Sequence, residues 1–104
     1  MISWPCMLKL DGDDELIYLD SFQKFNLECS ELIFTDDDYV IDASGNCYLI
    51  KSISGMLDLI ANDIRLSIDE VVKLVRAHEF NKVSVCLTKI NFLTVSEAIH
   101  SLNY

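Results

Sequence analysis

The sequence predicts an α+β domain in which an antiparallel-dominated sheet of about five to six strands packs against helices on one face, as two layers. Three observations lead to this fold class. Short apolar runs with a period of two, typical of half-buried strands, dominate the first half of the chain. Tight-turn residues separate these runs, which favours antiparallel pairing. Apolar residues at helical spacing dominate the second half, and strands followed by helices indicate an α+β architecture.

Size and composition fit one domain, residues 1–104. Of the 104 residues, 51% are hydrophobic and 10% aromatic, which is enough for a core without disulfides or metals. No apolar run reaches the roughly 18 residues of a membrane helix, and the N-terminus lacks the basic and apolar regions of a signal peptide. We therefore expect a cytoplasmic protein that does not bind membranes and is a monomer or a homodimer.

A hairpin is expected at the N-terminus. The stretch Ile2–Leu10 has apolar residues at its even positions and contains Pro5, which favours an edge strand or a bulge. Residues 11–14 form a turn around Gly12, and the strand Glu15–Asp20 completes the hairpin. An exposed edge strand would also be a docking edge for another chain.

The middle of the chain is expected to hold a connector and a second hairpin. The connector, Ser21–Ser30, is a short helix or an irregular segment, and a third strand follows at Glu31–Thr35. The second hairpin has the arms Tyr39–Asp42 and Cys47–Lys51. A turn containing Gly45, which tolerates positive φ, joins these arms.

The stretch after the second hairpin has apolar residues at helical spacing. Between Ile53 and Ile64 they recur at offsets of 0, 3, 4, 7, 8 and 11, which traces one helical face. Ser52 or Ser54 is the expected N-cap. This segment is therefore predicted to be the first main helix.

Capping boxes mark two further helices. Ser67 with Glu70 begins one of them, and Thr94 with Glu97 begins the last. Between these helices, Lys82–Ile90 alternates apolar and polar residues and is predicted to be another strand.

The expected core draws on both strands and helices. Substitution of a charged residue for Leu57 or Val85 is expected to unfold the protein. The predicted core residues are Trp4, Leu8, Tyr48, Ile50, Leu57, Ile60, Val72, Val75, Val85, Leu87 and Ile99.

The net charge of -9 is concentrated in the first half of the chain. Residues 1–52 hold 11 acidic and 3 basic residues, whereas residues 53–104 hold 6 and 5. Nucleic-acid binding is disfavoured, because affinity for the phosphate backbone comes from Lys and Arg. A basic protein partner, a cation or simple solubility are each consistent with this charge.

Two acidic turns form the candidate binding site. The favoured interpretation is a non-enzymatic protein-interaction module whose acidic half binds a basic protein partner. The alternative is a divalent-cation or small-ligand site, because Ca²⁺ and Mg²⁺ prefer oxygen ligands. The EF-hand pattern is absent, since Leu16 and Phe22 stand where its Gly and Glu belong. The candidate partner-binding residues are Asp11, Asp13, Asp14, Glu15, Asp36, Asp37 and Asp38.

A cysteine–histidine enzyme is the second alternative. No two of the four cysteines have the spacing of a zinc or redox motif. A thiol nucleophile would need Cys86 beside His78 or His100, but the apolar neighbours of Cys86 are expected to raise the pKa of its thiol. Phosphate-binding and hydrolase motifs are absent from the sequence. We expect no catalytic residue, no metal ligand and no cofactor.

Three stretches carry a resemblance to a known family. They are ISWPCMLKLDGDDEL (residues 2–16), DDDYVIDASGNCYLI (36–50) and SIDEVVKLVRAHEF (67–80). Together they resemble an uncharacterised domain-of-unknown-function family of small gammaproteobacterial proteins. The resemblance covers the whole chain and implies a bacterial cytoplasmic protein with no assigned activity. It provides no family site residues.

Overall fold

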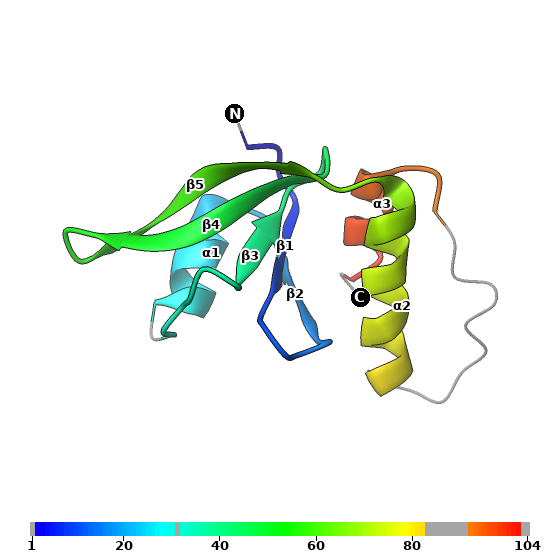
Figure 1. Ribbon diagram of the computed structural model, residues 1–104, viewed down its shortest axis with the longest axis horizontal. Coiled ribbons are helices and arrows are strands. Elements are labelled where there is room, and N and C mark those ends of the chain that lie inside the picture. The colour runs from blue at the N-terminus through cyan, green and yellow to red at the C-terminus, as the bar shows by residue number, and fades with distance from the viewer. Residues whose placement is uncertain (1, 31, 83–91, 103–104) are drawn as a thin grey trace.

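The computed structural model describes residues 2–30, 32–82 and 92–102, and its centre is a five-stranded sheet in the order β2-β1-β3-β4-β5. The strands are β1 (Cys6–Lys9), β2 (Leu16–Leu19), β3 (Tyr39–Ile41), β4 (Asn46–Ile53) and β5 (Met56–Arg65). The helices of the same ranges are α1 (Phe22–Cys29), α2 (Ile68–Lys82) and α3 (Val95–His100). Each neighbouring pair of strands is antiparallel, which confirms the predicted α+β class (Figure 1).

The N-terminal hairpin is confirmed, but its position in the sheet differs from the prediction. β1 pairs with β2 on one side and with β3 on the other, so the predicted edge strand and its docking edge are wrong. Pro5 lies immediately before β1 begins, and its missing N–H therefore costs no hydrogen bond of the sheet. The edges of the described sheet are β2 and β5.

The middle of the chain follows the prediction in two of its three parts. α1 forms, and the Oγ of its N-cap Ser21 accepts a hydrogen bond from the backbone N of Lys24 at 3.1 Å. The hairpin of β3 and β4 is also confirmed. The strand predicted at Glu31–Thr35 is wrong for its described residues, because 32–35 form a loop. Both edges of the following strand, β3, are already occupied by β1 and β4.

The helix predicted between Ile53 and Ile64 is wrong, because this segment is strand β5. Ser54 and Gly55 have φ angles of 53° and 80°, and two central residues with positive φ are what a type I′ hairpin turn requires. This turn joins β4 to β5, and their register pairs Ile53 with Met56 at the tip. The hairpin extends away from α2 (Figure 1).

The helices divide between the two faces of the sheet, so the predicted packing on one face is wrong. Alternating residues of β1 show the division. Leu8 packs in a cluster with Phe25 and Cys29 of α1, whereas Met7 packs in a second cluster with Val75 of α2 and Ile99 of α3. The physical reason is that successive strand residues point to opposite faces. Because these strands are apolar at consecutive positions, each face needs its own cover (Figure 1).

The predicted capping box at α2 is complete, whereas at α3 the Glu97 side chain accepts from Leu93 N at 3.3 Å and not from the N-cap Thr94. Ser67 Oγ accepts from Glu70 N at 3.2 Å, and Glu70 Oε1 accepts from Ser67 N at 3.1 Å. At α3, Thr94 Oγ1 accepts from Glu97 N at 3.1 Å. The strand predicted at Lys82–Ile90 lies outside the described residues, except for Lys82 at the end of α2. No helix in the described part of the chain is long and apolar enough to cross a membrane.

The predicted core is largely confirmed where it is described. Trp4 and Leu57 are half-buried, and Ile60, on the edge strand β5, is 40% exposed. Val85 and Leu87 lie outside the described residues. The confirmed core residues are Leu8, Tyr48, Ile50, Val72, Val75 and Ile99.

Candidate functional site

The two acidic turns lie side by side at one end of the sheet. β1 and β3 are paired so that Lys9 stands opposite Tyr39, which brings the turn after β1 next to the turn before β3. Asp38 joins them directly. Its Oδ1 accepts a hydrogen bond from Asp11 N at 2.7 Å, and its Oδ2 accepts one from Thr35 N at 2.8 Å.

Asp38, which connects the two turns, is buried and only 6% exposed. Burial alone would raise the pKa of its carboxyl, but the hydrogen bonds from the backbone of Asp11 and Thr35 outweigh burial and hold the pKa below its usual range. Both carboxylate oxygens are engaged, so Asp38 fixes the geometry of the turns around it.

The other six predicted acidic residues are exposed on the two turns, and we call them the acidic cluster. Asp13 Oδ1 accepts from Glu15 N at 2.9 Å and shapes its own turn. Asp36 forms an ion pair with Lys51 of β4. The cluster consists of Asp11, Asp13, Asp14, Glu15, Asp36 and Asp37. The structure therefore gathers residues 25 or so positions apart into one negatively charged surface.

Nothing in the described residues supports the cation alternative. Within residues 2–30, 32–82 and 92–102, no group of three or more His, Cys, Asp or Glu side chains is arranged to hold a metal ion. The carboxylate with the best enclosure, Asp38, already accepts backbone hydrogen bonds through both oxygens.

The described cysteines are poor nucleophiles. Cys6, Cys29 and Cys47 are free thiols, and each is buried. Burial raises the pKa of Cys29 and of Cys47 to about 11, and it raises the pKa of Cys6 further. Cys86, the predicted nucleophile of the enzyme alternative, lies outside the described residues.

The two histidines have structural contacts in different places. His78 is 4% exposed, and its Nδ1 accepts a hydrogen bond from Leu16 N at 2.9 Å. His100 is exposed, and its ring lies 6.4 Å from the ring of Tyr18, centre to centre. His78 therefore joins α2 to β2 through a ring nitrogen that carries no proton.

Asp42 is a buried carboxylate that the sequence analysis did not single out. It directly follows β3 and is 0% exposed. It accepts hydrogen bonds from Ser44 N and Asn46 N at 2.9 Å, from Ser3 N at 3.1 Å and from the hydroxyl of Tyr48 at 3.2 Å. Burial and the charge of Asp42 raise the pKa of Tyr48. These hydrogen bonds give Asp42 a structural role: its carboxylate stabilises the hairpin of β3 and β4 and holds the N-terminal segment against it.

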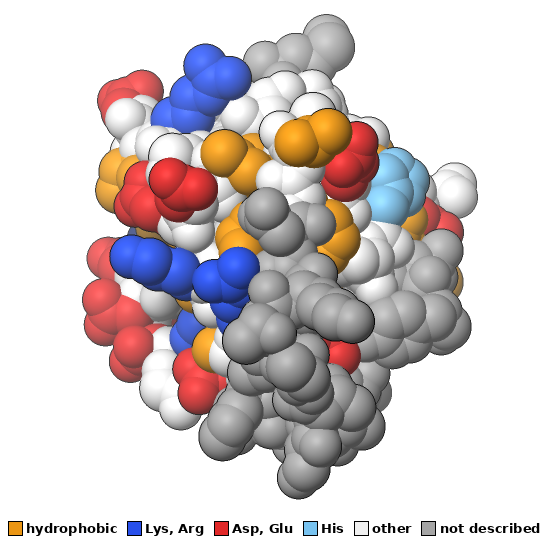
Figure 2. Space-filling view, turned by 90° about the vertical axis from the view of Figure 1, so that its right-hand side faces the viewer, with side chains coloured by type: hydrophobic (Ala, Val, Ile, Leu, Met, Phe, Trp, Pro, Cys, Tyr) orange, Lys and Arg blue, Asp and Glu red, His pale blue; other side chains and the backbone are white. Residues whose placement is uncertain are grey.

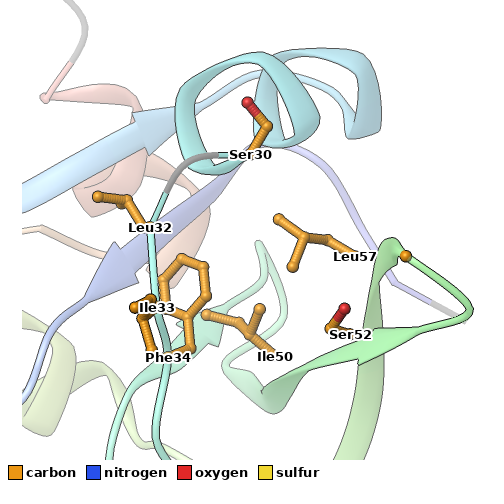
Figure 3. A pocket seen from close by; sticks show the side chains of 8 residues that line it. Ser30, Leu32, Ile33, Phe34, Ile50, Ser52 and Leu57 are labelled. Carbon is orange, nitrogen blue, oxygen red and sulfur yellow. The ribbon is translucent and has the colours of Figure 1, made fainter.

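A cavity of about 310 Å³, lined by apolar side chains together with Ser30 and Ser52, lies between the loop after α1 and the hairpin of β4 and β5 (Figure 3). Leu32 and Phe34 come from the loop, and Ile50 and Leu57 come from the two strands. This site was not predicted from the sequence, because the loop was expected to be a strand and β5 a helix. The full lining is Ser30, Leu32, Ile33, Phe34, Ile50, Ser52, Gly55 and Leu57.

The opposite side of the molecule has a mixed surface. On the side of α2 and α3, acidic and basic side chains are interspersed, and apolar side chains reach the surface only in small areas among the described residues (Figure 2).

Comparisons with known proteins give a family and a fold. The model of the family DUF4144, described as a protein structure with unknown function, matches residues 4–102. The structure is similar to the NMR structure of a protein from Shewanella amazonensis, a gammaproteobacterium, with a TM-score of 0.73 and 23% identity. That similarity covers 99% of this chain and 89% of the other. No match is found among curated proteins. The expected membership of a family of unknown function is thereby confirmed.

Proposed function

The chain belongs to DUF4144, a family of unknown function, and we propose that it is a non-enzymatic protein-interaction module. In this proposal the acidic cluster binds a basic partner. The observation that carries this proposal is the pair of hydrogen bonds by which Asp38 holds the two acidic turns together. A prearranged set of charges loses little conformational freedom on binding.

The charge balance around the cluster supports a basic partner. Two lysines lie nearby, and both have contacts within the molecule: Lys51 pairs with Asp36, and Lys9 Nζ donates to Leu10 O at 3.0 Å. The remaining carboxylates keep a negative field that attracts positive surfaces and speeds their association. We place this activity in the cytoplasm, because the free thiols Cys6, Cys29 and Cys47 suit a reducing compartment.

A comparison of two charge-matched variants tests the proposal. The triple variant D11N/E15Q/D37N removes three charges from the cluster at side chains with no hydrogen bond between described residues. The control D20N/D63N/D69N removes three exposed charges elsewhere. Tagged wild-type protein and both variants are incubated with lysate at low salt, and the captured proteins are eluted by a salt step and identified by mass spectrometry.

We expect the wild type and the control to capture near-equal amounts of one basic protein, and D11N/E15Q/D37N to capture none of it. Its capture should also weaken at high salt, because exposed charges are screened. Equal loss with both variants, or capture that persists in high salt, would show that the cluster is not the binding surface.

A further inference from the structure

The cavity between the loop after α1 and the hairpin of β4 and β5 has a second cavity next to it. The second cavity, of about 290 Å³, is lined by Phe22, Ile53, Met56, Leu57 and Asp58. Leu57 lines both cavities, so they lie next to each other, and we call the pair the apolar groove. Each cavity lies near the lower end of the roughly 300–1,000 Å³ of small-molecule sites. Two such adjoining hollows suit two neighbouring side chains of a peptide better than one larger ligand.

The groove is bordered by an unusual concentration of exposed apolar side chains. Ile33 is 94% exposed, Met56 is 69% exposed and Ile53 is 49% exposed. They stand on the loop after α1 and on the tip of the hairpin of β4 and β5 (Figures 1 and 3). Ile53 and Met56 are paired at the hairpin tip and therefore lie side by side, and exposed apolar patches of this kind mark interaction surfaces.

The charged side chains around the groove indicate which kind of partner it would bind. The lysines of the elements that form it are both paired with acids: Lys24 of α1 with Glu28 at 3.9 Å, and Lys51 of β4 with Asp36. Asp58 lines the groove, and no ion pair between described residues involves it. Asp58 therefore leaves the rim with a negative charge, and most of the lining is apolar.

One loop connects the groove to the acidic cluster. Leu32, Ile33 and Phe34 line the first cavity, and the same loop continues directly to the acidic residues Asp36 and Asp37. A chain bound in the groove would therefore reach the carboxylates with its next few residues. A second copy of this protein is a poor occupant, because it carries the same net charge of -9 and the same acidic rim.

We propose that the apolar groove binds a peptide segment in which two apolar or aromatic side chains stand next to Lys or Arg residues. The apolar side chains fill the two hollows on either side of Leu57, and the basic side chains contact Asp58 and the acidic cluster. This inference rests on the proposed function, to which it adds the chemical class of the partner. Few buried anchors supply most of the affinity in such complexes.

The test begins with peptide selection. A phage-displayed library of short random peptides is selected against the immobilised protein, and enriched peptides are synthesised with a fluorescent label. Their affinities are measured by fluorescence anisotropy, and their binding sites are mapped by amide chemical-shift changes. The groove variant is I33S, and the matched control is L93S at an exposed apolar residue far along the chain, Leu93, which is 85% exposed just before α3. Because Ile33 is almost fully exposed, its substitution leaves folding intact.

The proposal expects enriched peptides that combine apolar and basic residues, and shift changes at residues 32–34, 50–52 and 55–57. I33S should weaken binding by roughly tenfold or more, whereas L93S should leave it unchanged. Peptides that are basic but insensitive to I33S, and weakened by D11N/E15Q/D37N, would overturn the groove inference while the proposed function stands. Apolar peptides insensitive to the acid substitutions would overturn the basic character of the partner. No enrichment, or a dimer that I33S dissociates in sedimentation, would also overturn the inference.

Discussion

Asp38 illustrates how a single carboxylate organises the candidate site. It accepts hydrogen bonds from two backbone N–H groups that belong to different turns. Substitution D38N keeps the shape of the side chain but removes its charge, and replaces one acceptor oxygen by a donor. We expect D38N to lower the free energy of unfolding at pH 7 by about 1–3 kcal/mol, measured by urea denaturation.

The pH dependence of this loss follows from the lowered pKa of Asp38. A carboxyl whose pKa is lower in the folded state contributes stability that is fully present above its unfolded pKa, about 3.9. The contribution disappears as the pH falls through the folded pKa. The stability difference between wild type and D38N should therefore be constant near neutrality and shrink below about pH 3.9. A difference that stays constant down to pH 2 would contradict this account.

His78 offers a second test at the residue scale. Its Nδ1 is the acceptor for Leu16 N, the first residue of β2. Substitution H78F fills the space but leaves a buried N–H without this acceptor, so we expect a loss of about 1–3 kcal/mol in the free energy of unfolding. The control H100F changes an exposed ring and should have little effect in the same thermal or urea measurement.

Spacing in the sequence could not reveal the contact between Asp38 and Asp11. The acidic residues of both turns were predictable as turn residues, because Asp is favoured there. Their meeting depends on the pairing of β1 with β3, which lie on either side of β2 and α1 in the chain. Long-range pairing of this kind is set by the tertiary fold. The same holds for the bond between His78 and Leu16, which spans 62 positions.

Among the elements, β5 shows why periodicity alone misled the prediction. The apolar positions between Ile53 and Ile64 fit a helix, but Leu57 and Leu59 also alternate as a strand requires. The deciding residues are Ser54 and Gly55, which turn the chain back so that β5 pairs along β4. Ser54, which was predicted as a possible N-cap, is thus the first central residue of the hairpin turn.

The two hairpin glycines should differ in their tolerance of alanine. Both have positive φ, 90° at Gly45 and 80° at Gly55, which costs an alanine about 1–2 kcal/mol. A Cβ at Gly55 would meet nothing within 4 Å, whereas a Cβ at Gly45 would lie 2.5 Å from the backbone O of Leu66. We therefore expect G55A to lose about 1–2 kcal/mol of stability and G45A roughly 2–4 kcal/mol.

Urea denaturation of both variants measures this difference. Gly45 O also accepts a hydrogen bond from Leu66 N at 2.8 Å, so the close approach fixes the turn of β3 and β4 against the start of α2. Equal losses for the two variants would show that the backbone at Leu66 moves aside at little cost.

At the scale of the whole molecule, the sequence predicted the class of fold but not its layers. The consecutive residues Cys6, Met7 and Leu8 are all buried, so β1 is covered on both sides and is not the half-buried strand that the spacing of its apolar residues predicted. The structure accommodates them by placing α1 on one face and α2 with α3 on the other. The hairpin tip of β4 and β5 extends from this arrangement, and its apolar residues line the groove instead of the core. The proposed peptide binding therefore depends on which apolar residues the helices leave uncovered.

The distribution of charge over the molecule leads to a final prediction. The six carboxylates of the acidic cluster repel one another more strongly than six carboxylates spread over the surface would. Removing three of these charges in D11N/E15Q/D37N should raise the free energy of unfolding by several tenths of a kcal/mol, roughly 2–5 °C in Tm. The control D20N/D63N/D69N changes the net charge equally but relieves less local repulsion, so its Tm should rise less.

Salt separates local repulsion from the effect of net charge. Added NaCl screens exposed charges over about 8–10 Å at moderate ionic strength, and it should raise the Tm of the wild type and of the control. The rise should be smaller for D11N/E15Q/D37N, because part of the repulsion is already gone. Thermal denaturation at low and high NaCl measures all three proteins. Equal salt responses in the two triple variants would show that net charge, and not the cluster, sets the electrostatic cost. The carboxylates of the cluster would then affect stability no more than other exposed charges do, although Asp38 connects the two turns.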